Sequence, residues 1–172
     1  DSIVRGTTLK ESIINILSKL FPKKIIIVSS APQIRYPDCY GIDMSVMKSF
    51  VAFQAMIELC EEMGKEDFIE EIYERCKAQE DLPKEEMVNH VKELYAMFTD
   101  KQISDRIAAI VRPANLKYEL EVLFQTIEGL HLACPENLGD WYFSGDYPTP
   151  GGTKVVNKAF INYMEKSSER AY

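Results

Sequence analysis

Hydrophobic residues recur at two spacings along the chain, and each spacing predicts a different kind of element. Between residues 7 and 20 they repeat every three to four positions, which is the period of a helix with one buried face. A β-branched run at residues 25–28 follows Pro22 and is typical of a strand buried on both faces of a parallel sheet. Residues 116–124 alternate between apolar and charged side chains, which predicts a half-buried second strand. The first helix is expected to bury Leu9, Ile13, Ile16, Leu17 and Leu20.

Four helical patterns separate the two predicted strands. Ser45 and Thr99 are expected N-caps, Gln102 completes a capping box after Thr99, and Gly64 supplies a left-handed turn. We interpret residues 45–113 as a large helical insertion between parts of one α/β sheet. The four expected helices cover residues 45–64, 65–79, 83–98 and 99–113.

An apolar stripe at the start of this block has two interpretations. Such stripes are more often core than interface, and the block is then a structural insertion. The alternative is a subunit contact or a regulatory surface. The stripe consists of Met47, Phe50, Phe53, Met56 and Met63.

After the second strand, the pattern predicts a short helix, a loop and a last helix. The short helix covers residues 126–133, and a Gly- and Pro-rich loop follows at residues 135–152. Thr153 is the expected cap of the last helix. That helix is expected to place Val156, Ala159, Phe160 and Tyr163 on one face.

Composition narrows the class of protein. A length of 172 residues fits one domain. With 20 basic and 27 acidic side chains the net charge is −7, so capture of nucleic acid is disfavoured. No apolar run approaches the ~20 residues that span a bilayer, so no membrane partner is expected. Cysteines at 39, 60, 76 and 134 form no CxxC pair and favour free thiols in a reducing cytoplasm.

The residues that carry candidate chemistry lie directly before the first helix. The first helical N–H groups can bind an anion, Gly6 allows close backbone approach, and hydroxyls add donors for phosphate oxygens. A carboxylate at position 1 could bind sugar hydroxyls or hold Mg²⁺ against a diphosphate. These parts together suit a ribose 5-phosphate, although a plain turn with an N-cap is the alternative. The string is Asp1, Ser2, Ile3, Val4, Arg5, Gly6, Thr7 and Thr8.

This string resembles the phosphoribosyl pyrophosphate loop of type I phosphoribosyltransferases, and its Arg-Gly-Thr-Thr ending resembles that of the amidophosphoribosyltransferases. Residues 23–44, with Tyr-Gly-Ile-Asp at 40–43, and residues 143–149 are also similar to that family. The resemblance implies an α/β fold: an incomplete type I phosphoribosyltransferase parallel sheet with flanking helices. The chain would be the C-terminal part of the transferase domain, with further residues upstream.

In this family, ammonia released from glutamine by an N-terminal glutaminase domain is passed to phosphoribosyl pyrophosphate. The product, 5-phosphoribosylamine, enters purine biosynthesis. The resemblance assigns residues 1–8 to substrate binding and Asp1 to Mg²⁺ as well, with no catalytic residue in this chain, which is expected to be inactive alone. Implied partners are the glutaminase domain, purine nucleotide inhibitors and further subunits of a homo-oligomer.

Some members of the family hold an iron-sulfur cluster, and this sequence departs from their pattern. Asp38 stands at the first cysteine position, with Cys39 one residue late, and Gly139 and Tyr142 stand at the later pair. Cys134 is left alone, so we expect no cluster. The rival to the enzyme hypothesis is a noncatalytic module that uses a degenerate phosphoribosyl loop to bind nucleotides.

Overall fold

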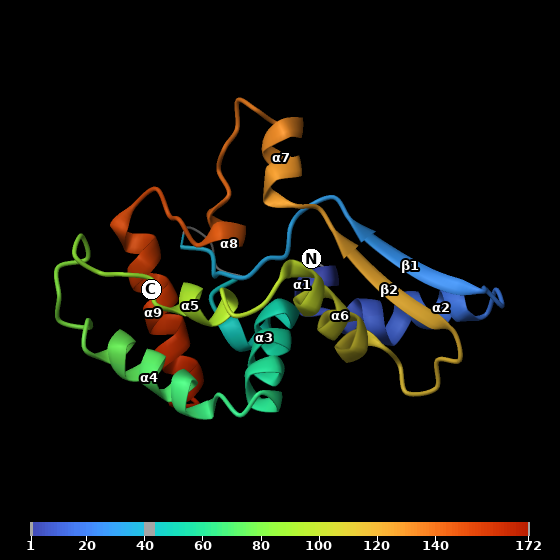
Figure 1. The fold of residues 1–172 in the computed structure, drawn as a ribbon, viewed down its shortest axis with the longest axis horizontal. Helices are drawn as coiled ribbons and strands as arrows, with labels where there is room; N and C mark the ends of the chain where they lie inside the picture. Colours follow the sequence, from blue (N-terminus) through green and yellow to red (C-terminus); the bar gives the residue numbers. More distant parts are fainter. Residues whose placement is uncertain (1, 40–43, 172) are drawn as a thin grey trace.

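A parallel strand pair forms one end of the molecule (Figure 1). β1 (Lys24–Ser29) pairs in parallel with β2 (Glu119–Phe124), and Ser29 lies opposite Phe124. The prediction that the sheet resumes after the helical block is therefore confirmed, and the chain is of mixed α/β class. The computed structural model describes the chain in two stretches, residues 2–39 and 44–171.

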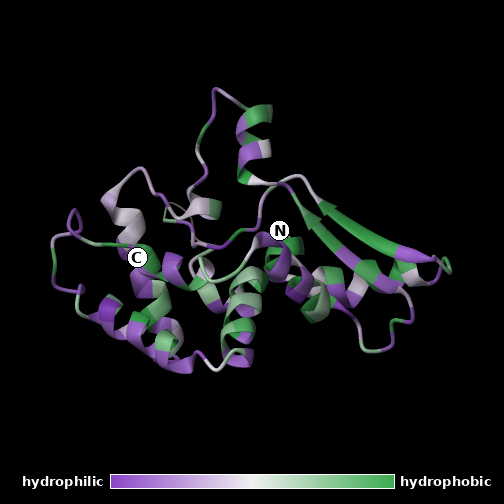
Figure 2. Ribbon diagram, in the orientation of Figure 1, coloured by the Kyte–Doolittle hydropathy of each residue, from purple (hydrophilic) through white to green (hydrophobic). Residues whose placement is uncertain are grey.

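The sheet is covered on one face only, so the expectation that β1 is buried on both faces is wrong for the described residues. Ile25 is 4% exposed and Val122 is 3% exposed, whereas Ile26 and Val28 are 50% and 72% exposed. The first helix and α6 lie along the inner face (Figure 1). Figure 2 shows that β1 is hydrophobic along most of its length.

The first helix forms as predicted, but it buries a different set of residues. After the short α1 (Ser2–Arg5), residues 7–18 are helical, and a π-helical turn, η1 (Leu9–Ile13), precedes α2 (Ile14–Ser18). The N–H of Ile14 donates to the carbonyl of Leu9, five residues back. This wider turn places Ile14 in the core beneath Leu9. The expected core residues Ile13, Ile16 and Leu20 are instead 36%, 59% and 73% exposed.

The apolar stripe of the helical block is core. A 3₁₀ turn, η2 (Met47–Ser49), leads into α3 (Val51–Glu62), so Phe50 and not Ser45 is the N-cap residue. Gly64 has the predicted left-handed conformation, with φ of 64°. Of the stripe, only Met63 is exposed, at 55%, while the side chains at 1% exposure or less are Met47, Phe50, Phe53 and Met56.

The capping box before α6 (Asp100–Val111) is confirmed: Thr99 accepts from the N–H of Gln102, whose side chain accepts from the N–H of Thr99. The expected helix at residues 65–79 is also present as α4 (Glu66–Lys77). Of the helix expected at 83–98, only α5 (Val91–Tyr95) forms.

Side-chain contacts explain why residues 83–90 are not helical. The Oε1 atom of Gln79 accepts from the N–H of Val88 at 2.7 Å, and its Nε2 atom donates to the Val88 carbonyl at 3.2 Å. Asn157 Nδ2 donates to the same carbonyl at 3.0 Å. These bonds satisfy backbone groups that a helix would otherwise use, so tertiary contacts override local propensity here.

The C-terminal region contains α7 (Ile127–Ala133), α8 (Trp141–Ser144) and α9 (Pro150–Met164). The predicted short helix is present as α7. Thr126 caps it, because the Thr126 Oγ1 atom accepts from the N–H of Gly129. Thr153 is not a cap, because α9 begins with Pro150, a residue well suited to the first helical position. As expected, Val156, Ala159 and Phe160 are buried.

Helix α9 contributes aromatic side chains to the core. The Phe53 and Tyr163 rings meet edge to face with centroids 4.8 Å apart, and Phe160 lies 6.2 Å from Phe53. Such pairs add stabilisation beyond the apolar area they bury.

None of the helices in the described stretches is both long and apolar enough to cross a bilayer.

None of the four cysteines forms a disulfide bond with another described residue. Cys60 and Cys76 are buried, and burial raises the pKa of Cys60 to about 11 and that of Cys76 to about 12 from an ordinary value of 9.0. Cys134 is exposed. The buried thiols therefore remain protonated in the folded chain at pH values where an unfolded chain would lose the protons.

We predict that the free energy of unfolding falls as the pH rises above 9.0. The folded state binds more protons there, so each buried thiol contributes a decrease of up to about 1.4 kcal/mol per pH unit. Cys60→Ala should make this slope shallower between pH 9 and 11, measured by urea denaturation. Cys134→Ala is the matched control, and an equal change of slope in both variants would contradict the prediction.

Candidate phosphate-binding site

The N-terminal segment lies against the carboxyl ends of the parallel strands (Figure 1). A cavity of about 190 Å³ there is lined by residues from α1, both strand ends, α3 and α6. Open α/β sheets place their ligands at this edge. Among the residues that line the cavity are Ile3, Val4, Ser29, Gln33 and Phe124.

The string at residues 1–8 was expected to form one loop, but the structure differs. Its first part forms α1, in which Val4 is 9% exposed and packs in the core. Arg5, Thr7 and Thr8 are exposed. Asp1 and the side chain of Ser2 lie outside the described residues. Of this string, Ile3 and Val4 line the cavity, whereas Gly6 is buried beside it and the Thr7 and Thr8 side chains are exposed outside the lining.

Gly6 determines how this segment turns. Its φ of +72° is a conformation that glycine adopts at little cost, and its carbonyl accepts the first helical bond from the N–H of Lys10 at 2.9 Å. A Cβ atom at this position would lie 2.8 Å from Cγ1 of Val111 and 3.5 Å from Cγ2 of Val51. The helix therefore begins at residue 7, and the first N–H groups of a helix have no partner within it.

The two other segments that carry the family resemblance lie side by side. The N–H groups of Arg35 and Tyr36 donate to the carbonyl of Tyr142 at 2.9 and 3.1 Å. The Tyr142 hydroxyl donates to Asp38 Oδ1 at 3.1 Å, and the Tyr147 hydroxyl donates to the carbonyl of Pro37. Two stretches more than 100 residues apart thus form one unit after β1.

A polar cluster that no sequence pattern indicates fixes the loop after β1. Gln33 is 3% exposed, and its Nε2 atom donates to the Asp100 carbonyl and to Ser104 Oγ, both at 2.8 Å. Its Oε1 atom accepts from Arg35 at 2.7 Å. Arg35 also pairs with the Asp100 carboxylate and stacks over the Tyr95 ring, 5.2 Å from its centroid. No spacing rule in the sequence predicts that Gln33 is buried.

Tyrosines around this loop stay neutral. Burial raises the pKa of Tyr36, Tyr95 and Tyr147 above the ordinary value of 10.0. Tyr95 and Tyr147 consequently keep the protons with which they donate to the carbonyls of Arg35 and Pro37. The loop is therefore held by neutral hydrogen bonds that do not change over the physiological pH range.

The described residues contain no group of three or more His, Cys, Asp or Glu side chains arranged to hold a metal. A cation at this edge would depend on few protein ligands, a manner of binding typical of Mg²⁺ with a phosphate substrate. The predicted protein ligand, Asp1, lies outside the described residues.

A helix start and exposed hydroxyls at the carboxyl edge of parallel strands are an arrangement that α/β phosphate-binding proteins use. The chain is, more particularly, similar to amidophosphoribosyltransferases. It is 43% identical to that of Haemophilus influenzae over 70 residues, which are 40% of this chain and 14% of the relative. It is 40% identical to that of Saccharomyces cerevisiae over 82 residues, 45% of this chain and 16% of the relative.

The chain is also 48% identical to the Escherichia coli amidophosphoribosyltransferase over 52 residues, which are 30% of this chain and 10% of the relative. The resemblance inferred from the motifs is confirmed. The matched stretches span less than a fifth of the length of these relatives. No family model matches the chain. No solved structure matches it significantly.

We predict that Gly6→Ala destabilises the fold more than Gly64→Ala. Both glycines have a positive φ, but an added Cβ at Gly64 meets nothing within 4 Å. Backbone strain of about 1 kcal/mol should be common to both variants. Gly6→Ala should cost a further 1 kcal/mol or so from overlap with buried Val111. If urea denaturation gave the same loss of unfolding free energy for both variants, Gly6 would not be closely packed.

Tyr147→Phe tests the contact between the two resemblance segments. It leaves the Pro37 carbonyl without its donor and should lower the free energy of unfolding by about 1–2 kcal/mol. Tyr118→Phe is the control, because the hydroxyl of this half-buried side chain has no hydrogen-bond partner among the described residues. A Tyr147→Phe protein as stable as the control would contradict this role.

Proposed function

We propose that this chain is the C-terminal part of the phosphoribosyltransferase domain of a longer amidophosphoribosyltransferase. Residues 45–113 would be a helical insertion in that domain, and a glutaminase domain would precede it. The longer protein would convert phosphoribosyl pyrophosphate and glutamine into 5-phosphoribosylamine for purine biosynthesis, in the cytoplasm. The proposal is for the longer protein and not for the isolated chain.

The observation that carries this proposal is the position of the Gly6-Thr7-Thr8 helix start. Ile3 and Val4 of the segment that resembles a phosphoribosyl pyrophosphate loop line the cavity with the last residues of β1 and β2, and the exposed Thr7 and Thr8 side chains begin the next helix, where their hydroxyls would be available to phosphate oxygens. The similarity to named amidophosphoribosyltransferases supports it independently.

In this proposal residues 1–8 form the substrate site. The 5-phosphate would bind the helix start, and Asp1 would contact the ribose hydroxyls and Mg²⁺, which neutralises the diphosphate leaving group. The protein must also exclude water, because water competes with ammonia for the sugar carbon. Purine nucleotide inhibitors would compete for these phosphate contacts, and the enzyme would assemble as a homo-oligomer.

We further propose that the domain holds no iron-sulfur cluster. Two of the positions aligned with cluster cysteines are Asp38 and Tyr142, and these side chains hydrogen-bond to each other at 3.1 Å. A stoichiometric iron-sulfur absorbance in anaerobically prepared protein would contradict this proposal.

The experiment is a kinetic comparison in the full-length protein that contains this chain. Thr7→Val with Thr8→Val removes two exposed hydroxyls and should leave the fold intact. Loss of charge-assisted hydrogen bonds to phosphate should lower kcat/KM for phosphoribosyl pyrophosphate at least about 10-fold. Lys19→Gln, an exposed change at the far end of the same helix, should have no effect.

Two results would overturn the proposal. Full-length protein that forms no phosphoribosylamine from either glutamine or ammonia, yet binds nucleotides, would favour the noncatalytic binding module. Activity that is unaffected by the double threonine variant would move the phosphate site away from residues 6–8.

A further inference from the structure

A second, larger cavity lies away from the sheet, between α4, α9 and the segments that follow them. Its volume of about 800 Å³ is within the range of small-molecule sites. It shares no lining residue with the cavity at the sheet edge. Its walls are rich in basic side chains although the whole chain carries a net charge of −7. The charged residues that line it are Lys77, Lys84, Lys154, Lys158, Arg170, Glu80 and Asp81.

Only part of this positive charge is neutralised. Lys77 pairs with Glu165 at 2.6 Å, and Lys158 pairs with Glu80 at 3.0 Å. The other three basic side chains are exposed and make no ion pair with any described residue, and Asp81 is the remaining acid in the lining. The unpaired basic residues are Lys84, Lys154 and Arg170. A cavity with this surplus of charge attracts anions.

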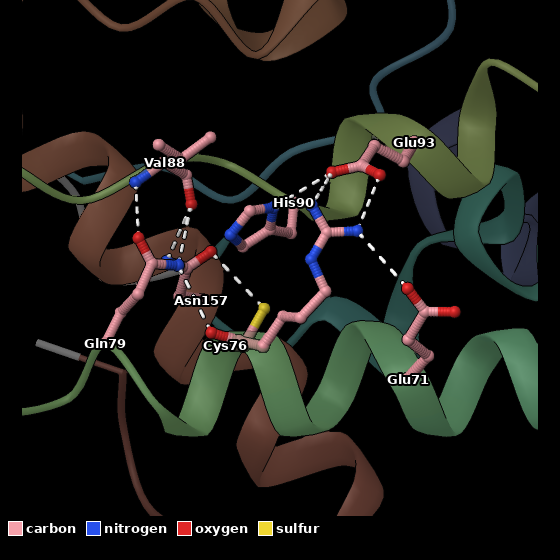
Figure 3. Close-up of polar contacts among 8 residues, drawn as sticks. Glu71, Cys76, Gln79, Val88, His90, Glu93 and Asn157 are labelled. Atoms are coloured by element: carbon pink, nitrogen blue, oxygen red, sulfur yellow. Dashed lines mark hydrogen bonds and ion pairs between the residues drawn. The ribbon is translucent and has the colours of Figure 1, made fainter.

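The wall that carries Lys84 is held in place by the contacts shown in Figure 3. Besides its two bonds to Gln79, Val88 is bound by Asn157, whose Oδ1 atom accepts from the Cys76 thiol at 3.5 Å. This network ties the irregular segment between α4 and α5 to α4 and to α9. The cavity therefore has a fixed polar floor, formed by neutral groups that are already hydrogen-bonded.

An ion-pair cluster anchors the far end of the same segment. Arg75 donates to both carboxylate oxygens of Glu93 at 2.8 Å, and His90 Nδ1 lies 2.9 Å from each of these two side chains (Figure 3). The Arg75 guanidinium holds the pKa of Glu93 below its ordinary value. The bidentate pair fixes α5 against α4, so residues 80–90 are held at both ends.

The remaining walls suit an organic phosphate. Gly151, in the first turn of the 15-residue α9, lines the cavity, so the positive end of that helix adds to the basic side chains. An apolar wall is formed by the half-buried Met87 together with Val155, Ile161 and Ala171, which line the cavity although they are largely buried. Phosphate groups and a flat apolar ring could therefore bind side by side.

We propose that this cavity is a binding site for a small molecule that carries two or more phosphate groups, distinct from the site at the sheet edge. The surplus of unpaired basic side chains selects multiply charged anions, and the apolar wall provides a surface for an attached ring. The site is independent of the proposed transferase activity.

The test is calorimetric titration of the full-length protein with three probes: inorganic tripolyphosphate, a nucleoside triphosphate and the corresponding nucleoside. Lys84→Gln, Lys154→Gln and Arg170→Gln are combined in one variant, which should weaken tripolyphosphate binding at one site at least about 10-fold. Lys19→Gln, Lys23→Gln and Lys117→Gln, all exposed and outside the cavity, form the matched control with the same loss of charge. Thermal denaturation verifies that both variants are folded.

Each outcome decides the matter. Equal binding of tripolyphosphate and nucleotide supports a site that recognises phosphate alone, and tighter binding of the nucleotide shows that the apolar wall contributes. Binding that is equally strong in the cavity variant and the control, or nucleoside binding that matches nucleotide binding, would overturn the proposal. The Thr7→Val, Thr8→Val variant leaves this cavity unchanged. Failure of the cavity proposal is therefore distinguishable from failure of the phosphate site proposed at the sheet edge.

Discussion

The parallel pairing of β1 with β2 constrains the rest of the structure. Parallel neighbours cannot be joined by a tight turn, so the chain must leave the carboxyl end of β1 and return to the amino end of β2. Here that connection contains the entire helical block, with its own core around Phe53 and Met56. One consequence is that α6, the last helix of the block, packs on the sheet and brings Ser104 beneath Gln33.

Local rules were sufficient for several features that depend on neighbouring residues, although the predicted Ser45 and Thr153 caps were wrong. The capping box of Thr99 and Gln102, the left-handed Gly64 and the alternation along β2 were all predictable, because each depends on a few adjacent residues. They were insufficient at residues 83–90. There, the backbone of Val88 is bound by Gln79 and Asn157, and the second of these lies on a helix that the chain reaches much later.

The candidate site also combines features that the sequence predicts with features that depend on tertiary contacts. A glycine followed by threonines at a helix start could be predicted from the sequence. The packing of Gly6 against Val111 could not, because it depends on how α6 crosses the N-terminal segment. The contacts of Gln33 with α6 also belong to the tertiary fold. Sequence motifs thus indicate candidate ligand-binding groups, while the groups that support them emerge only from the structure.

The π-helical turn at Leu9–Ile13 has a consequence for how the length of this helix can vary. The turn contains one residue more than an α-helical turn, and it is this extra residue that places Ile14 beneath Leu9. Loss of one residue between these positions would restore ordinary α-helical spacing and leave the same isoleucine facing the core. The segment from Leu9 to Ile14 is therefore a place where evolution can insert or delete a single residue without rotating the rest of the helix relative to the sheet.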